Sequence, residues 1–163
     1  MLHLIFRLIP APLHRQLYRI ADKTRRRWWR VRKPDRTSVL TAAFDKRGRV
    51  LLVRHSYGPA VWALPGGGIG RDEDPAAGAA REFREELKCD LVNIVEVDAI
   101  VCEESGSRDF LHLFAAELAG APVPDMREIV AAALFDRDDL PRPCDRRVGL
   151  AVARAFAALS EQR

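Results

Sequence analysis

Three acidic residues stand close together in one stretch of this chain, at a spacing that could hold a divalent cation. The stretch runs from Leu64 to Cys89 and reads LPGGGIGRDEDPAAGAAREFREELKC. In a helix, Glu82, Glu85 and Glu86 stand at positions i, i+3 and i+4 and share one face. Like charges at that spacing destabilise an isolated helix by about 0.2–0.5 kcal/mol per pair. A cation would relieve the repulsion, and carboxylate oxygens suit Mg2+ or Mn2+.

The residues around these acids predict the helix that must position them. Asp72 or Asp74 is a candidate N-cap, and Pro75 is suited to the first helical position. The helix is predicted to end near Leu87. A run of glycines after a proline, Gly66 to Gly68, predicts a tight turn ahead of the helix.

The spacing resembles the Nudix box, G-x5-E-x7-R-E-U-x-E-E-x-G-U, where U is a bulky aliphatic residue. Gly67 opens the match, Glu73 follows six residues on, and Arg81-Glu82-Phe83-Arg84-Glu85-Glu86 supplies the core. Six fixed identities at fixed spacing should match a random window about once in a million or less. The alternative, a solvated acidic helix face, does not account for a glycine turn, Glu73 and Arg81 all standing in register.

The chain departs from the box at three positions near the helix end. Phe83 and Cys89 stand at aliphatic positions, and Lys88 stands where the family has glycine. That glycine lies just past the helix, where left-handed backbone is common, and a lysine held there would cost roughly 1 kcal/mol. We expect the last turn to be reshaped, with every fixed acidic position retained.

The resemblance implies an α/β fold: a Nudix-type α/β/α sandwich with a mixed β-sheet between helices. It also implies a pyrophosphohydrolase that depends on Mg2+ (or Mn2+) and cleaves a nucleoside diphosphate linked to another moiety. The metal ligands that it implies are Glu82, Glu85, Glu86 and the backbone carbonyl of Gly67. ADP-ribose, nucleotide sugars, oxidised nucleoside triphosphates, dinucleoside polyphosphates and the 5′ end of RNA all stay open as substrates.

The resemblance further suggests roles for the side chains near the metal. Arg81 is expected to pair with Glu73 and orient the helix, and a direct clamp on phosphate is the alternative. The proton acceptor is expected to be a box glutamate or a loop glutamate, for which Glu128 is better placed than Glu103 or Glu104. The catalytic candidates are Glu82, Glu85, Glu128 and Arg81, and the substrate-binding candidates are Gly66, Gly67 and Trp62.

Two aromatic or polar residues near the glycine turn carry weaker signals. Trp62 could touch a substrate base, or it could be a buried aromatic that supports the turn. His55 is a lone histidine after a predicted strand, and we interpret it as a polar loop residue.

Alternating and β-branched patterns predict the strands that complete a sandwich, and the resemblance extends over roughly Thr37 to Pro141. A β-hairpin is predicted from residues 37–44 and 49–54 around the turn signal at 45–48. Further strands are expected at 61–64, 90–101, 109–118 and 129–135, and a second amphipathic helix at 145–160.

Composition places the chain among single-domain globular proteins. It has 163 residues, of which 48% are hydrophobic and 31% charged. Its three cysteines are widely spaced and odd in number, which favours a reducing compartment. No apolar run approaches the roughly 20 residues of a membrane-spanning helix. We therefore expect a cytoplasmic protein.

The basic charge is concentrated in an N-terminal extension, residues 1–36, ahead of a predicted hydrolase domain at 37–163. Met1 to Arg36 holds eleven Lys or Arg and two acids, a net charge of +9, which leaves −5 for the rest of a total of +4. Leucines, isoleucines and tryptophans interleave with these basic residues, which suggests an amphipathic helix. Its apolar face could pack on the domain, lie on the anionic inner face of a membrane, or accompany binding to RNA. An organelle transit peptide is a further interpretation.

Two functional classes follow from these observations. The first is the hydrolase, with a nucleotide-derived small molecule as substrate. The second is a non-catalytic Nudix-fold module that senses a nucleotide, or an adaptor at a membrane surface. Retention of all the box glutamates favours the hydrolase. The sequence makes no prediction of oligomeric state.

Overall fold

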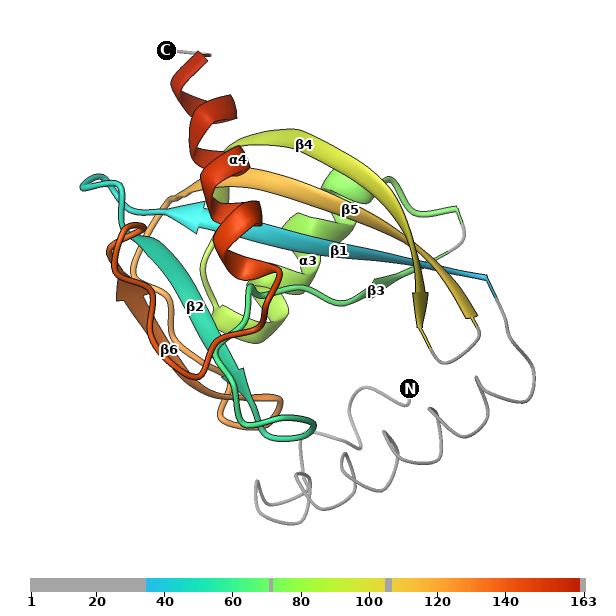
Figure 1. The fold of residues 1–163 in the computed structure, drawn as a ribbon, viewed down its shortest axis with the longest axis horizontal. Coiled ribbons are helices and arrows are strands. Elements are labelled where there is room, and N and C mark those ends of the chain that lie inside the picture. The colour runs from blue at the N-terminus through green and yellow to red at the C-terminus, as the bar shows by residue number, and fades with distance from the viewer. Residues whose placement is uncertain (1–34, 71, 105–106, 162–163) are drawn as a thin grey trace.

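The computed structural model describes residues 35–70, 72–104 and 107–161. Six strands and two helices make up this part of the chain (Figure 1). In chain order they are β1 (Arg36–Phe44), β2 (Val50–His55), β3 (Gly68–Ile69), α3 (Pro75–Leu87), β4 (Leu91–Glu104), β5 (Ser107–Leu118), β6 (Ile129–Phe135) and α4 (Val148–Glu161).

The strands form one mixed sheet in the order β4-β5-β1-β2-β6, with β3 beside β1. β1 and β5 run parallel, and the other neighbours run antiparallel. The predicted hairpin between β1 and β2 pairs only at Phe44 and Val50. Beyond that pair the two strands separate, because β1 continues along β5 while β2 continues along β6. The predicted strand at 61–64 is reduced to two isolated bridges, at Trp62 and Ala63.

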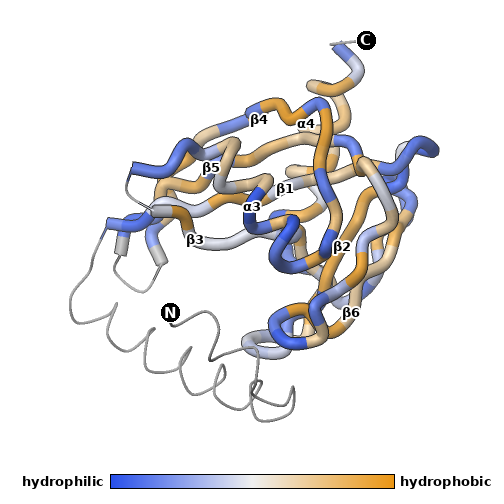
Figure 2. The backbone as a smooth tube through the Cα atoms, turned by 180° about the vertical axis from the view of Figure 1, so that it is seen from behind, coloured by the Kyte–Doolittle hydropathy of each residue, from blue (hydrophilic) through white to orange (hydrophobic). Residues whose placement is uncertain are grey.

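The two helices cover opposite faces of the sheet, as Figures 1 and 2 show from the two sides. The α4 side buries alternate residues of β1 and β2, namely Ala42, Phe44, Val50 and Leu52, against Val148, Val152, Ala155 and Leu159. The α3 side buries the intervening residues, among them Val39, Ala43, Leu51 and Val53, with Ala79, Phe83 and Leu87. The predicted sandwich is confirmed, and the period of two in β2 puts His55 on the α3 face and Arg54 on the α4 face.

Helix α3 has the predicted N-cap and the predicted end at Leu87, but the expected reshaping of its last turn is wrong. Asp74 is the N-cap, and its Oδ1 accepts a hydrogen bond of 2.9 Å from the backbone N–H of Ala77. Pro75 occupies the first turn. Lys88 caps the other end with φ 52° and ψ 29°, so a lysine does occupy the left-handed position. Side chains such as Phe83 and Leu87 hold the helix to the sheet, and burying one of them fully contributes about 1.5–3 kcal/mol.

The N-terminal extension falls almost wholly outside the described residues, so its amphipathic character and its boundary at residue 36 stay predictions. Within the described ranges, β1 already begins at Arg36. None of the helices in those ranges is both long enough and apolar enough to cross a membrane.

Candidate active site

The glycine turn is fastened to β1 by backbone hydrogen bonds. The N–H groups of Val39 and Thr41 donate to the carbonyls of Gly67 and Pro65, each at 2.9 Å. Gly66 has φ +151°, and a Cβ there would lie 2.1 Å from the Val39 carbonyl oxygen. Only glycine fits so close to a neighbouring backbone. The turn therefore brings its own backbone against the sheet directly beside helix α3.

Gly67 brings the turn into contact with the box helix. A Cβ on Gly67 would lie 2.6 Å from Oε2 of Glu82, so the absent side chain leaves room for this carboxylate. The Gly67 carbonyl, one of the predicted metal ligands, already accepts the Val39 N–H. A carbonyl oxygen has two lone pairs, so one stays available for a second partner.

The ion pair predicted between Arg81 and Glu73 is present and bidentate. Arg81 Nε lies 2.7 Å from Glu73 Oε1, and Nη2 lies 3.0 Å from Oε2. This pairing, together with the backbone N–H of Gly70, lowers the pKa of Glu73 from 4.5 to about 2. The ion pair ties the loop before α3 to the second turn of the helix.

Arg81 also reaches two of the three box glutamates. Its Nη1 lies 2.9 Å from Glu82 Oε1 and 3.3 Å from Glu85 Oε2. The Glu82 side chain is 17% exposed and that of Glu85 is 52% exposed. Burial raises the pKa of Glu82, and the hydrogen bond from Arg81 opposes that rise. These two carboxylates thus already share one positive charge.

Glu86 differs from its neighbours because it lies on the buried side of the helix. The residue is 4% exposed, and among the described residues its Oε2 has no hydrogen-bond partner. The N–H of Gly66 donates to the carboxylate, while burial and the charges of Glu128 and Glu82 raise its pKa well above the usual range. Burying an ionised carboxylate costs several kcal/mol unless a cation or donors compensate it.

The loop before β6 carries Glu128 to this side of the helix. Within this loop, the backbone N–H of Val123 donates to the carbonyl of Leu87 at 2.6 Å, and that of Asp125 donates to the carbonyl of Glu86 at 2.9 Å. The Asp125 side chain then accepts the N–H groups of the next turn, including that of Glu128 at 3.0 Å. The loop thereby satisfies carbonyls at the end of α3 and sets the place of the Glu128 carboxylate.

Glu128 has a hydroxyl donor of its own. The hydroxyl of Tyr57 donates to Glu128 Oε1, and the Glu128 carbonyl accepts the Ser56 N–H at 2.8 Å. Glu103 and Glu104, the competing loop acids, close the end of the β4–β5 hairpin opposite Arg108 and Ser107.

His55 joins the carboxylates, although its place after a strand predicted only a polar loop residue. Ligand atoms of His55, Glu86 and Glu128 all lie within 4.8 Å of one another. Burial lowers the pKa of His55, and the charges of Glu128 and Asp125 oppose this. The alternation of β2 carried a signal for the face of His55, because it stands two residues after Val53 and four after Leu51, which pack against α3.

Trp62 lies among core residues. Its ring makes an edge contact with Phe135, at 4.9 Å between centroids, and Arg54 stacks over it at 4.7 Å. The ring packs against the hydrophobic cluster on the α4 side. These contacts agree with the interpretation of Trp62 as a supporting aromatic. A role in substrate binding stays a prediction.

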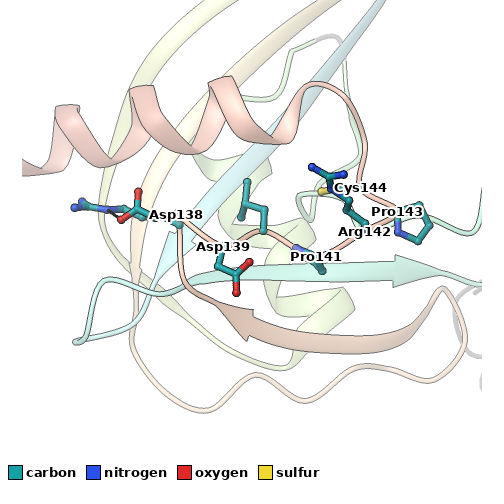
Figure 3. A pocket seen from close by; sticks show the side chains of 8 residues that line it. Asp138, Asp139, Pro141, Arg142, Pro143 and Cys144 are labelled. Carbon is teal, nitrogen blue, oxygen red and sulfur yellow. Dashed lines mark ion pairs between the residues drawn. The ribbon is translucent and has the colours of Figure 1, made fainter.

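A separate hollow lies in the loop between β6 and α4 (Figure 3). Its lining runs from Arg137 to Cys144 and includes none of the box residues. The candidate site is therefore the carboxylate group around Glu86 and not this hollow.

The residues around Glu86 fit a divalent cation. The donor set is made of carboxylate oxygens and a backbone carbonyl, which Mg2+ and Mn2+ prefer. The buried Glu86 oxygen without a partner is a position that a cation would satisfy.

Two relatives of known name match part of this chain in sequence. The chain is similar to the RNA pyrophosphohydrolase of Acidiphilium cryptum, with 41% identity over 66 residues, 38% of this chain and 40% of that protein. It is also similar to the RNA pyrophosphohydrolase of Gluconacetobacter diazotrophicus, with 38% identity over 70 residues, 38% of this chain and 42% of that protein. The matches thus span about two-fifths of these relatives.

A solved structure shares the fold over nearly its whole length. The crystal structure of a MutT NUDIX hydrolase from Burkholderia pseudomallei superposes with a TM-score of 0.66 and 25% identity, covering 74% of this chain and 97% of that one. The sequence matches the NUDIX domain family over residues 34–155. Since that range is most of the chain, the protein belongs to the NUDIX domain family.

Proposed function

We propose that this protein is a Mg2+- or Mn2+-dependent pyrophosphohydrolase that cleaves a nucleoside diphosphate linked to another moiety. The observation that carries the proposal is the buried Glu86 carboxylate beside Glu82 and Glu128. Three acids in such a place repel one another and are poorly solvated, so a divalent cation is the partner that best explains them.

Glu82, Glu85 and Glu86, with the Gly67 carbonyl, would hold the metal. Bound there, a divalent ion would neutralise charge on the diphosphate and lower the pKa of a water molecule. Arg81 would keep two of these carboxylates in place and is a candidate to face a phosphate oxygen as well. Gly66 and Gly67 are candidates to bind the substrate through their backbone, since Val39 and Glu82 already fill the space that their side chains would take.

The proton of the attacking water would pass to a carboxylate of this group. Glu82, Glu85 and Glu128 are the candidates, and each needs a free oxygen within hydrogen-bond reach of that water. Arg81 holds an oxygen of Glu82 and of Glu85, and Tyr57 holds an oxygen of Glu128. Each carboxylate therefore keeps one oxygen that could accept the proton.

Among the open substrates, we propose the phosphorylated 5′ end of RNA. The resemblance to two RNA pyrophosphohydrolases supports this choice. The charge of residues 1–36 supports it too, because a basic segment attracts the phosphate backbone of RNA.

A panel of substrates tests the proposal with the full-length chain and Mg2+. It should include a 5′-triphosphorylated RNA, ADP-ribose, a nucleotide sugar, an oxidised nucleoside triphosphate and a dinucleoside polyphosphate, with the products identified by mass. We expect phosphate or pyrophosphate from the RNA. If metal binds but no substrate is cleaved, the non-catalytic sensing module becomes the better explanation.

A variant of Glu85 tests whether the box carboxylates carry the activity. Glu85→Gln is expected to lower turnover by about 100-fold or more without unfolding the protein, because its side chain is largely exposed. The control is Glu96→Gln, an exposed glutamate on β4, which should keep wild-type turnover. Wild-type turnover in Glu85→Gln would contradict the assignment.

A further inference from the structure

His55 is a half-buried histidine beside two carboxylates, and the proposed reaction does not use it. A nitrogen of its ring and an oxygen each of Glu86 and Glu128 lie within 4.8 Å of one another. Ligand atoms around one ion stand about 3–4.5 Å apart, since each metal–ligand bond is about 2.1–2.3 Å long. Small side-chain rotations would therefore let all three touch one ion.

The pairing of β2 with β6 brings His55 and Glu128 close together. Arg54 pairs with Ala131, but His55 pairs with Ile129, so β6 contains one extra residue at this point. Such a bulge bends a strand and redirects nearby side chains. The next hydrogen bond joins the Ser56 N–H to the Glu128 carbonyl, so His55 and Glu128 are held on adjoining ends of the two strands.

Two buried polar atoms at this place lack partners. Neither Nδ1 of His55 nor Oε2 of Glu86 has a hydrogen-bond partner among the described residues. Glu86 is almost fully buried, with only 4% of its surface exposed. Buried polar groups are nearly always paired, so an unpaired atom on each of two residues of this group points to a shared partner. By contrast, Glu82 and Glu85 already share Arg81.

We propose that His55 is a metal ligand, and that with Glu86 and Glu128 it forms a mixed nitrogen–oxygen cation position beside the box glutamates. The inference deepens the proposed function and rests on it. Glu128 would bind through the oxygen that Tyr57 does not hold, which leaves Glu82 or Glu85 to accept the proton of the attacking water.

The nitrogen donor has a consequence for metal choice. Imidazole binds transition ions better than it binds Mg2+, which prefers oxygen ligands alone. The wild-type protein should therefore bind Mn2+ more tightly than Mg2+, and this preference should depend on His55.

Pulsed electron paramagnetic resonance of Mn2+ bound to the full-length, untagged chain gives a direct test. An imidazole nitrogen bonded to Mn2+ produces nitrogen modulation of the signal, which changes its pattern when the histidines carry 15N. We expect this modulation in the wild-type protein and its loss in His55→Gln. His55→Gln should also weaken Mn2+ binding by about tenfold or more, while Mg2+ binding changes less.

The matched control is His112→Gln. His112 lies on β5 and bonds to Glu96 through Nδ1 at 2.6 Å, and this variant should keep the modulation. The isotope arm needs no substitution, so it shows whether a histidine binds the ion even if His55→Gln folds poorly. A chain with His3, His14 and His112 all replaced by glutamine keeps His55 as its one histidine, and its modulation then decides for His55.

The outcomes separate the inference from the proposed function. Bound Mn2+ without nitrogen modulation, or modulation that persists in His55→Gln, overturns the role of His55 and leaves metal-dependent hydrolysis standing. A chain that binds neither Mn2+ nor Mg2+ overturns both.

Discussion

The three glutamates of the box share one helix face by spacing, yet their surroundings differ. Glu85 is half exposed, Glu82 is held between Arg81 and Gly67, and Glu86 is buried beneath them. Without a metal ion, Arg81 can supply the positive charge for Glu82 and Glu85 but not for Glu86. Under the proposed function, Glu86 is therefore the residue whose energetics would depend most on a bound metal.

Glu86→Gln is expected to separate stability from metal binding. The amide removes a buried charge, so the metal-free variant should be more stable than the wild type by about 1 kcal/mol or more. At 100 times the dissociation constant, Mg2+ should stabilise the wild type by about 2.7 kcal/mol and the variant hardly at all. Thermal unfolding in EDTA and in Mg2+ measures both effects, with Glu96→Gln as the control. An equal Mg2+ shift in both proteins would remove Glu86 from the metal site.

At the scale of elements, the ion pair between Glu73 and Arg81 fixes where helix α3 begins relative to the loop before it. Glu73→Gln should remove that ion pair. Because the pKa of Glu73 is about 2 in the folded protein against 4.5 ordinarily, its contribution to stability is complete above pH 4.5 and is lost as the pH falls towards 2. The difference in melting temperature between wild type and variant should shrink over that window. A difference that stays constant from pH 7 to pH 2 would show that the carboxylate charge contributes nothing.

The other end of α3 carries backbone strain at Lys88, whose φ is 52°. Lys88→Gly should stabilise the protein by up to about 1 kcal/mol, because glycine adopts left-handed backbone without strain. Asn93→Gly is the matched control, since Asn93 has the same φ but asparagine tolerates it better. Urea unfolding compares the two. A larger gain at Asn93 than at Lys88 would contradict the strain argument.

Local signals predicted the elements well, and long-range pairing limited the prediction of the site. Asp74 and Pro75 mark the start of α3 through their own capping and backbone preferences, which a sequence states directly, whereas Lys88 ends the helix against its own preference. The burial of Glu86 depends on which way the helix faces the sheet. The approach of His55 to Glu128 depends on a bulge between β2 and β6, which lie far apart in the chain, and no local pattern records it.

At the scale of the whole molecule, charge is divided between the extension and the rest of the chain, with +9 in residues 1–36 and −5 beyond them. If the acidic site acts as proposed, residues 37–163 with their net negative charge would repel a polyanionic substrate until metal is bound. A basic segment ahead of those residues would offset the repulsion for a long substrate such as RNA. A small dinucleotide, which has few phosphates, would gain less from it.

Replacing Arg25, Arg26 and Arg27 together by glutamine in the full chain tests whether the basic segment helps to bind RNA. We expect KM for triphosphorylated RNA to rise and its dependence on salt to weaken. The slope of log affinity against log salt should change by about 0.7 for each phosphate that the arginines no longer neutralise. Turnover at saturation, and KM for a dinucleoside polyphosphate, should stay the same because the acidic site is unaltered. Steady-state kinetics at several salt concentrations give all of these quantities. An equal rise in KM for both substrates would mean that the arginines support the fold of the domain, since binding to RNA alone cannot affect the smaller substrate.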